Sequence, residues 1–170
     1  IGLIKREYPG FQGRITMTMR EVDECMAAGA DVVSIDCTDC VRGDGLTPTE
    51  FLKAVREEYP NIIIMADCAT FEEGVAAHAA GADLVGTTMN GYTPQTAGET
   101  GEPNFALVAR LVKTLPCPVI AEGRIHTPEQ ARKMLEIGAW AVVVGGAITR
   151  PLEIASRFMA AVRDLPGGMV

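Results

Sequence analysis

The sequence lacks both a cluster of basic residues and a long hydrophobic run. Its 15 Lys and Arg residues are outnumbered by 22 Asp and Glu residues, which gives a net charge of −7. Because no basic stripe offsets this charge, we expect no nucleic-acid partner. The longest apolar run, Ile62–Ala66, is far shorter than the roughly 20 residues that span a bilayer. We therefore expect no membrane partner either.

Cysteines are few, and they do not form a ligand pattern. Of the five cysteines, only Cys37 and Cys40 have the CxxC spacing of zinc and redox sites, and no second pair of ligands accompanies them. The odd number argues against a disulfide framework. We therefore predict a reduced, cytoplasmic protein with no metal site.

The chain instead contains an alternation of short apolar segments and helical patterns. With 170 residues, 48% of them hydrophobic, it can bury one core, and we predict a single domain over 1–170. Strands are expected at Ile1–Ile4, Val32–Ile35, Ile62–Ala66, Leu84–Gly86, Val119–Ala121 and Ala141–Val144. Helices are expected at Met19–Ala28, Thr49–Glu58, Phe71–Ala80, Phe105–Thr114, Pro128–Ile137 and Leu152–Arg163. Asn104 and Thr127 are predicted N-caps. Strands without polar alternation are typical of a parallel sheet, so this pattern predicts an α/β fold.

Polar residues or glycines occupy the carboxyl end of every expected strand. They are Lys5, Asp36, Asp67, Thr87 with Thr88, Glu122, and Gly145 with Gly146. In a (β/α)8 TIM barrel that end is the active-site face, and in a doubly wound sheet it also binds ligands. We predict the TIM barrel and interpret the chain as about six of its eight βα units.

Two segments near these ends are predicted to help bind a ligand. Gly145 and Gly146 leave backbone N–H groups accessible to a phosphate, and Arg150 can contact a phosphate in a bidentate manner. The segment Gly91–Pro103 is rich in Gly, Thr and Pro and is expected to be a mobile loop over the site.

The motifs of the chain resemble those of the N-acetylmannosamine-6-phosphate 2-epimerase family, and they occur in the family's order. They are IGLIKREYP at 1–9, RITMTMREVD at 14–23, SIDCTD at 34–39, MADCATFEEG at 65–74, GTTMNGYTP at 86–94, AEGRIHTPEQA at 121–131 and GAWAVVVGGAITRP at 138–151. The resemblance implies a TIM-barrel enzyme of sialic acid and amino-sugar catabolism, an N-acylglucosamine-6-phosphate 2-epimerase. Such an enzyme interconverts N-acetylmannosamine 6-phosphate and N-acetylglucosamine 6-phosphate at C2, without a metal or organic cofactor.

The resemblance also implies the residues of the site. Lys5 matches the family's catalytic lysine, and Glu122 matches the acid opposite it. The expected substrate-binding residues are Asp67, Thr88, Tyr92 and Arg124, and the expected phosphate-binding residues are Gly145, Gly146 and Arg150.

Inverting a carbon next to a carbonyl requires a base for the C–H proton and a group that stabilises the enolate. Lys5 is the expected base, and strand alternation turns Arg6 to the opposite face. Whether Lys5 works alone or shares proton transfer with Glu122 stays open, as does the choice between site lining and loop capping for Asp36.

Two other functions also stay open. One is another phosphate-binding TIM-barrel isomerase or lyase, since a glycine-rich ending after the last strand is common among them. The other is an inactive barrel fragment that acts only in ligand binding or assembly, because a glutamine and an arginine from the family's first two strands are not in this chain. The exposed sheet edges expected at Ile1–Ile4 and Ala141–Val144 favour a homodimer or broader self-association, poor folding and little epimerase activity.

Overall fold

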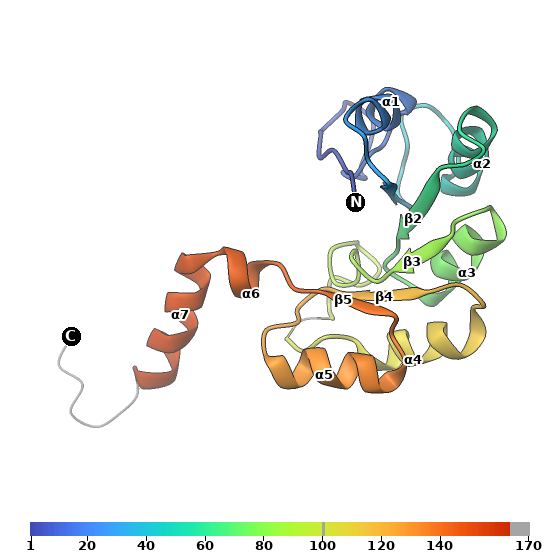
Figure 1. Ribbon diagram of the computed structural model, residues 1–170. Coiled ribbons are helices and arrows are strands. Elements are labelled where there is room, and N and C mark those ends of the chain that lie inside the picture. Colours follow the sequence, from blue (N-terminus) through green and yellow to red (C-terminus); the bar gives the residue numbers. More distant parts are fainter. Residues whose placement is uncertain (100, 164–170) are drawn as a thin grey trace.

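The structure is a computed structural model that describes residues 1–99 and 101–163, in which strands and helices alternate (Figure 1). The strands are β1 (Val32–Asp36), β2 (Ile63–Asp67), β3 (Leu84–Gly86), β4 (Val119–Glu122) and β5 (Ala141–Val143). The helices are α1 (Met19–Ala27), α2 (Pro48–Glu58), α3 (Phe71–Ala79), α4 (Phe105–Thr114), α5 (Pro128–Ile137), α6 (Gly146–Thr149) and α7 (Pro151–Val162). Apart from the short α6, all of these elements were predicted from the sequence with closely similar bounds.

The five strands form one parallel sheet in the order β1-β2-β3-β4-β5, so each strand pairs with its neighbour in sequence. Helices α1 to α5 follow one another around one side of this sheet (Figure 1). A doubly wound sheet would reverse its strand order and carry helices on both faces. The consecutive order therefore confirms the TIM-barrel prediction over the doubly wound alternative.

The prediction of a further strand at Ile1–Ile4 is wrong. This segment lies beside β1 but makes only one isolated parallel bridge, between Gly2 and Val33. The chain then turns back, and the carbonyl of Ile15 accepts a hydrogen bond of 2.8 Å from the backbone N–H of Asp36. Ile15 thus occupies the position along β1 that a longer N-terminal strand would need.

The two faces of the sheet carry different side chains. Because successive residues of a strand point to opposite faces, Val33, Ile35 and Ile64 enter the core between the sheet and the helices. Ser34 and Asp36 alternate with them and face the other way, and both are buried. The helix side of the sheet therefore supplies the hydrophobic core, and the opposite side is available for polar groups.

Side-chain caps begin the helices that follow β1 to β4. Thr47, Thr70 and Thr127 each accept a hydrogen bond from the backbone N–H three residues further on. Asn104 caps α4 in the same way. The caps predicted at Asn104 and Thr127 are thus confirmed, and each such cap stabilises its helix by about 1 kcal/mol. These caps determine where each strand-to-helix loop ends.

Helices α6 and α7 project away from the sheet (Figure 1). The apolar side chains of Leu152 and Phe158 on α7 are 81% and 73% exposed. β5 is the outermost strand of the described sheet, so the edge expected near Ala141–Val144 is confirmed. None of the helices within 1–99 and 101–163 combines the length and the apolar character needed to cross a bilayer.

Candidate functional site

Acidic residues close three of the strands at the same edge of the described sheet. β1 ends at Asp36, β2 at Asp67 and β4 at Glu122. The register pairs Asp36 with Asp67 across the two strands. The carboxyl ends of parallel strands meet at one edge, so the strand-end residues predicted from the sequence are brought together here.

Asp67 is the most deeply buried of these acids, with 1% of its surface exposed. One carboxyl oxygen accepts a hydrogen bond from the hydroxyl of Ser34, and the other accepts one of 2.6 Å from the hydroxyl of Thr88. Removal from water raises the pKa of Asp67 to about 7, and the charges of Glu122 and Asp36 act in the same direction. The two hydroxyls oppose this rise without cancelling it. Asp67 is therefore poised to hold a proton near neutral pH.

Glu122 is half-buried at the end of β4, and its carboxyl lies 3.1 Å from the same Thr88 hydroxyl. Its backbone is held by the Thr87 hydroxyl, which donates to the Glu122 carbonyl at 2.8 Å and accepts from the Glu122 N–H at 3.1 Å. Burial raises the pKa of Glu122, while the hydrogen bond from Thr88 and the charge of Lys5 lower it. The lysine and the glutamate predicted as catalytic partners therefore lie close enough to interact.

The side chain of Lys5 is exposed, and its backbone pairs with Ile15 in an antiparallel bridge. The neighbouring guanidinium of Arg6 turns to the helix side, where it forms an ion pair of 3.0 Å with Glu24 of α1. The opposite orientation of Arg6 was predicted from strand alternation and is confirmed. Within residues 1–99 and 101–163 the amine of Lys5 forms no ion pair, and its charge acts on Glu122 at the end of β4.

Asp36 caps the loop that follows β1. One of its oxygens accepts from the N–H and the hydroxyl of Thr38 at 3.1 and 2.5 Å, and the other accepts from the N–H of Arg14 at 3.0 Å. Of the two roles left open by the sequence, the hydrogen bonds support loop capping. Asp36 still affects the site, because its charge raises the pKa of Asp67.

Arg124 holds the loop between β3 and α4. Its guanidinium donates to the carbonyls of Asn90, Glu99 and Glu102 and, at 2.6 Å, to the side-chain oxygen of Asn90. A Cβ atom on Gly91 would collide with this guanidinium. Arg124 therefore acts as a clamp for the loop, and the substrate contact expected for it stays a prediction.

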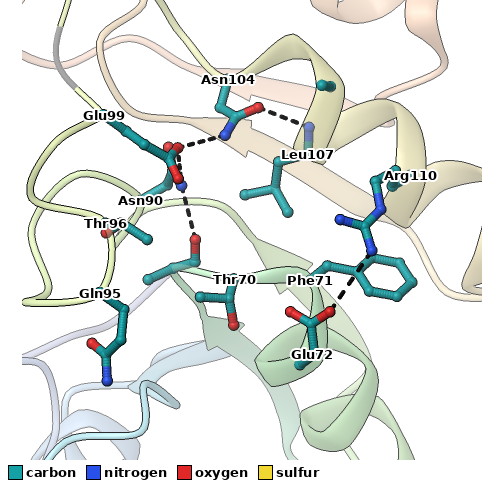
Figure 2. A pocket seen from close by; sticks show the side chains of 12 residues that line it. Thr70, Phe71, Glu72, Asn90, Gln95, Thr96, Glu99, Asn104, Leu107 and Arg110 are labelled. Carbon is teal, nitrogen blue, oxygen red and sulfur yellow. Dashed lines mark hydrogen bonds and ion pairs between the residues drawn. The ribbon is translucent and has the colours of Figure 1, made fainter.

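The outer side of the same loop borders a cavity of about 290 Å³ between the start of α3 and the start of α4. Figure 2 shows the Glu99 carboxylate between Asn90 and Asn104, from which it accepts hydrogen bonds of 2.9 and 2.6 Å. Across the cavity, Arg110 and Glu72 form an exposed ion pair of 3.7 Å. The loop is thus anchored on both sides, although residue 100 of the predicted segment Gly91–Pro103 lies outside the described residues.

The residues expected to bind phosphate lie at the end of β5. Gly145 precedes the single turn of α6, which Gly146 begins, and the first N–H groups of a helix have no acceptor within it. The Arg150 side chain is 67% exposed and forms an ion pair of 2.7 Å with Glu153. Glu153 raises the pKa of Arg150, and Tyr92 adds a smaller effect. Tyr92, itself 69% exposed, therefore lies near enough to Arg150 to interact with it.

Ser34 is the site residue that sequence reasoning missed. Its only signal was its position two residues before Asp36, which places both on one face of β1. Cys37 and Cys40, which have the CxxC spacing, are both free thiols. Within the described part of the chain, no group of three or more His, Cys, Asp or Glu side chains is arranged to hold a metal ion.

The sequence matches one family over almost its whole length. The family model "Putative N-acetylmannosamine-6-phosphate epimerase" matches residues 1–164. A protein of Caldanaerobacter subterraneus subsp. tengcongensis that carries the corresponding 2-epimerase name is 51% identical over 164 residues, covering 96% of this chain and 69% of that protein. A relative of the same name from Enterobacter sp. (strain 638) is 45% identical over 163 residues, with 95% and 69% coverage.

A solved structure gives the same assignment. The N-acetylmannosamine-6-phosphate 2-epimerase from Clostridium perfringens is similar with a TM-score of 0.87 and 42% identity, covering 95% of this chain and 69% of that chain. Thiamine phosphate pyrophosphorylase from Pyrococcus furiosus has a TM-score of 0.56 at 22% identity, covering 83% and 63%, and shares the fold alone. The chain belongs to the N-acetylmannosamine-6-phosphate epimerase family.

Proposed function

We propose that this chain is an N-acylglucosamine-6-phosphate 2-epimerase of sialic acid and amino-sugar catabolism. It interconverts N-acetylmannosamine 6-phosphate and N-acetylglucosamine 6-phosphate by removing and returning the proton at C2. The observation that carries the proposal is the family match, made over a site where the charge of Lys5 acts on Glu122 and Asp67 lies beside Glu122.

The proposed chemistry uses the open-chain sugar, in which C2 lies next to the C1 carbonyl. The amine of Lys5, in its neutral form, removes the C2 proton, and the negative charge that develops moves to the C1 oxygen. A protonated Glu122 can donate a hydrogen bond to that oxygen, which stabilises the enolate. Raised pKa values at Glu122 and Asp67 support this role, since an acid must hold its proton to act as a donor. Acid–base groups suffice for this reaction, so the proposal needs no metal or organic cofactor.

The proposed phosphate site is the turn at Gly145 and Gly146 together with Arg150. Backbone N–H groups at the start of α6 can donate to phosphate oxygens, and the guanidinium of Arg150 adds a charged donor. A Cβ on Gly146 would lie 2.9 Å from the Glu153 carboxylate, whereas one on Gly145 would meet open space. Gly146 is thus the glycine at which a side chain is expected to disturb the turn.

The test is NMR of the purified chain with N-acetylmannosamine 6-phosphate in deuterated water. We expect formation of N-acetylglucosamine 6-phosphate and replacement of the C2 proton by deuterium, with Lys5→Ala as the inactive control. NMR follows a slow reaction over days, so a low rate is still measured. Absence of both product and exchange, beside an active Clostridium perfringens epimerase, would overturn the proposal.

The same experiment separates the two possible proton routes. If one base serves both faces of C2, deuterium enters the recovered substrate as well as the product. If Lys5 and Glu122 each serve one face, deuterium enters the product, while substrate recovered early, before product converts back, keeps its C2 proton. Unphosphorylated N-acetylmannosamine is the control for the phosphate site, and we expect it to react far more slowly.

A further inference from the structure

The hydroxyl of Thr88 lies between two carboxyl groups. Its oxygen is 2.6 Å from Oδ1 of Asp67 and 3.1 Å from Oε2 of Glu122. Thr88 follows β3, which runs between the strands that end in these two acids. Gly86 leaves the space for this arrangement, since a Cβ there would lie 3.2 Å from the Thr88 hydroxyl and 3.3 Å from Oδ1 of Asp67.

A count of protons constrains this trio. A hydroxyl has one proton to donate and otherwise only accepts, and an ionised carboxylate only accepts. Thr88 can therefore donate to Asp67 or to Glu122, but not fully to both. Towards the second carboxyl it presents a lone pair, so that contact is a hydrogen bond only when the second carboxyl carries a proton. Both short distances are satisfied together when Asp67 and Glu122 hold one proton between them.

We propose that Asp67 and Glu122 share a single proton through the hydroxyl of Thr88, and that Thr88 is the positioning residue which lets Glu122 alternate between acid and base. The catalytic part of this inference rests on the proposed epimerase function. In one arrangement Glu122 donates to Thr88 and Thr88 donates to Asp67. In the other, Asp67 donates to Thr88 and Thr88 donates to Glu122. Two protons move together between these arrangements, and the net charge of the trio stays at −1.

The groups that face the carboxyl pair come from every neighbouring strand. From β1, Ser34 donates to the second oxygen of Asp67, and the charge of Asp36 raises the pKa of Asp67. From the N-terminal segment, the cation of Lys5 lowers the pKa of Glu122. From β5, Val143 pairs with Glu122 and does not ionise.

Two cysteines adjoin the same strand ends. Burial raises the pKa values of Cys37 and Cys68 well above their usual value, so both remain neutral thiols in the pH range considered. With the pair itself included, three carboxyl groups, those of Asp36, Asp67 and Glu122, lie near one another, and the cation named above as acting on them is Lys5. Negative surroundings disfavour ionisation of both members of the pair at once.

The first arm of the test needs no substrate. Carboxyl ¹³C chemical shifts of Asp67 and Glu122 are followed against pH in the chain enriched with labelled Asp and Glu, with Asp67→Asn and Glu122→Gln used for assignment. We expect each carboxyl to respond in two steps, because each senses the proton of the other. In Glu122→Gln the Asp67 carboxyl should titrate in a single step, with its midpoint lower by about one pH unit or more.

Thr88→Val removes the hydroxyl and retains the shape of the side chain, and Thr88→Ser restores the hydroxyl. We expect Thr88→Val to weaken the mutual response of the two carboxyls and Thr88→Ser to recover it. Thr87→Val is the matched control, because in the described part of the chain the Thr87 hydroxyl bonds to the backbone of Glu122 and to neither carboxyl. A titration in Thr88→Val that matches the wild type, or two carboxyls that are both ionised at neutral pH in the wild type, overturns proton sharing.

The second arm measures the pH profile of C2 exchange. We expect Thr88→Val to shift the acidic limb of the profile by about one pH unit, and Thr87→Val to leave its position unchanged. Linked titration with an unshifted profile overturns the role of Thr88 in catalysis. Linked titration in a chain that shows no exchange at all overturns the epimerase proposal and leaves proton sharing as a property of the site. Should Thr88→Val not fold, Thr88→Ser and Glu122→Gln still decide the first arm.

Discussion

The free energy of unfolding is expected to depend on pH through Asp67, and replacement of Asp67 by Asn should remove most of this dependence. The pKa of Asp67 is 3.8 for an ordinary, solvated carboxyl, as in the unfolded chain, and about 7 in the folded protein. Between these pH values the folded state holds a proton that the unfolded state has lost. The folded state is then the one that binds more protons, so the free energy of unfolding decreases as pH rises through this window. Below and above it, the contribution of Asp67 is constant.

The size of the effect follows from the same two pKa values. They are about 3 pH units apart, and each unit corresponds to roughly 1.36 kcal/mol. Ionisation of Asp67 in place should therefore destabilise the fold by about 4 kcal/mol between acidic and neutral pH. Asn keeps the shape and the contacts, because its oxygen can accept from Ser34 and its amide can donate to Thr88. Asp67→Asn should thus be more stable than the wild type above pH 7, and the advantage should vanish towards pH 4.

Urea denaturation of the two proteins between about pH 4 and pH 8 measures this difference. Asp39→Asn is the control, because Asp39 lies in the loop after β1 and is exposed. It should leave the slope of stability against pH unchanged. Parallel stability curves for the wild type and Asp67→Asn would refute the reasoning, since they would show that burial does not hold a proton on Asp67.

Three further outcomes are expected at the site. Lys5→Ala should abolish C2 exchange while leaving the circular dichroism spectrum and phosphate binding intact. Near-normal turnover in this variant would show that another residue is the base. Arg150→Ala should raise KM for N-acetylmannosamine 6-phosphate more than it lowers kcat, because an exposed contact to phosphate binds ground and transition states alike; an equal loss in kcat would contradict this. Arg124→Ala should increase hydrogen exchange of the backbone amides at 90–99 by at least about fivefold, since loss of even one hydrogen bond costs about 1 kcal/mol; unchanged exchange would show that the loop is held by its outer contacts alone.

Much of the fold could be predicted because its signals are local. Buried strands and the Thr and Asn caps are each determined by residues close together in sequence. The failure at Ile1–Ile4 has a different origin. That apolar segment had the composition of a strand, but Ile15 forms the hydrogen bond with the end of β1. Such competition between two segments for one partner is not visible in the composition of either.

The site shows the same division. Strand-end acids such as Asp67 and Glu122 could be placed from the sequence, because strands of one parallel sheet end at one edge. The hydrogen bond from Ser34 to Asp67 could not, since it depends on the packing of β1 against β2. The hydrogen bonds from Arg124 to loop carbonyls could not be predicted either, because every residue has a backbone carbonyl and the sequence does not show which one is bound.

The consecutive order of the strands also has a consequence for how the chain folds during synthesis. Each strand pairs with the one made just before it, with a single helix and its loops between partners such as Met65 and Leu84. The entropy lost in closing each connection is therefore small, and no strand has to wait for a distant segment. The sheet can grow in the direction of translation, one unit at a time, as the chain leaves the ribosome.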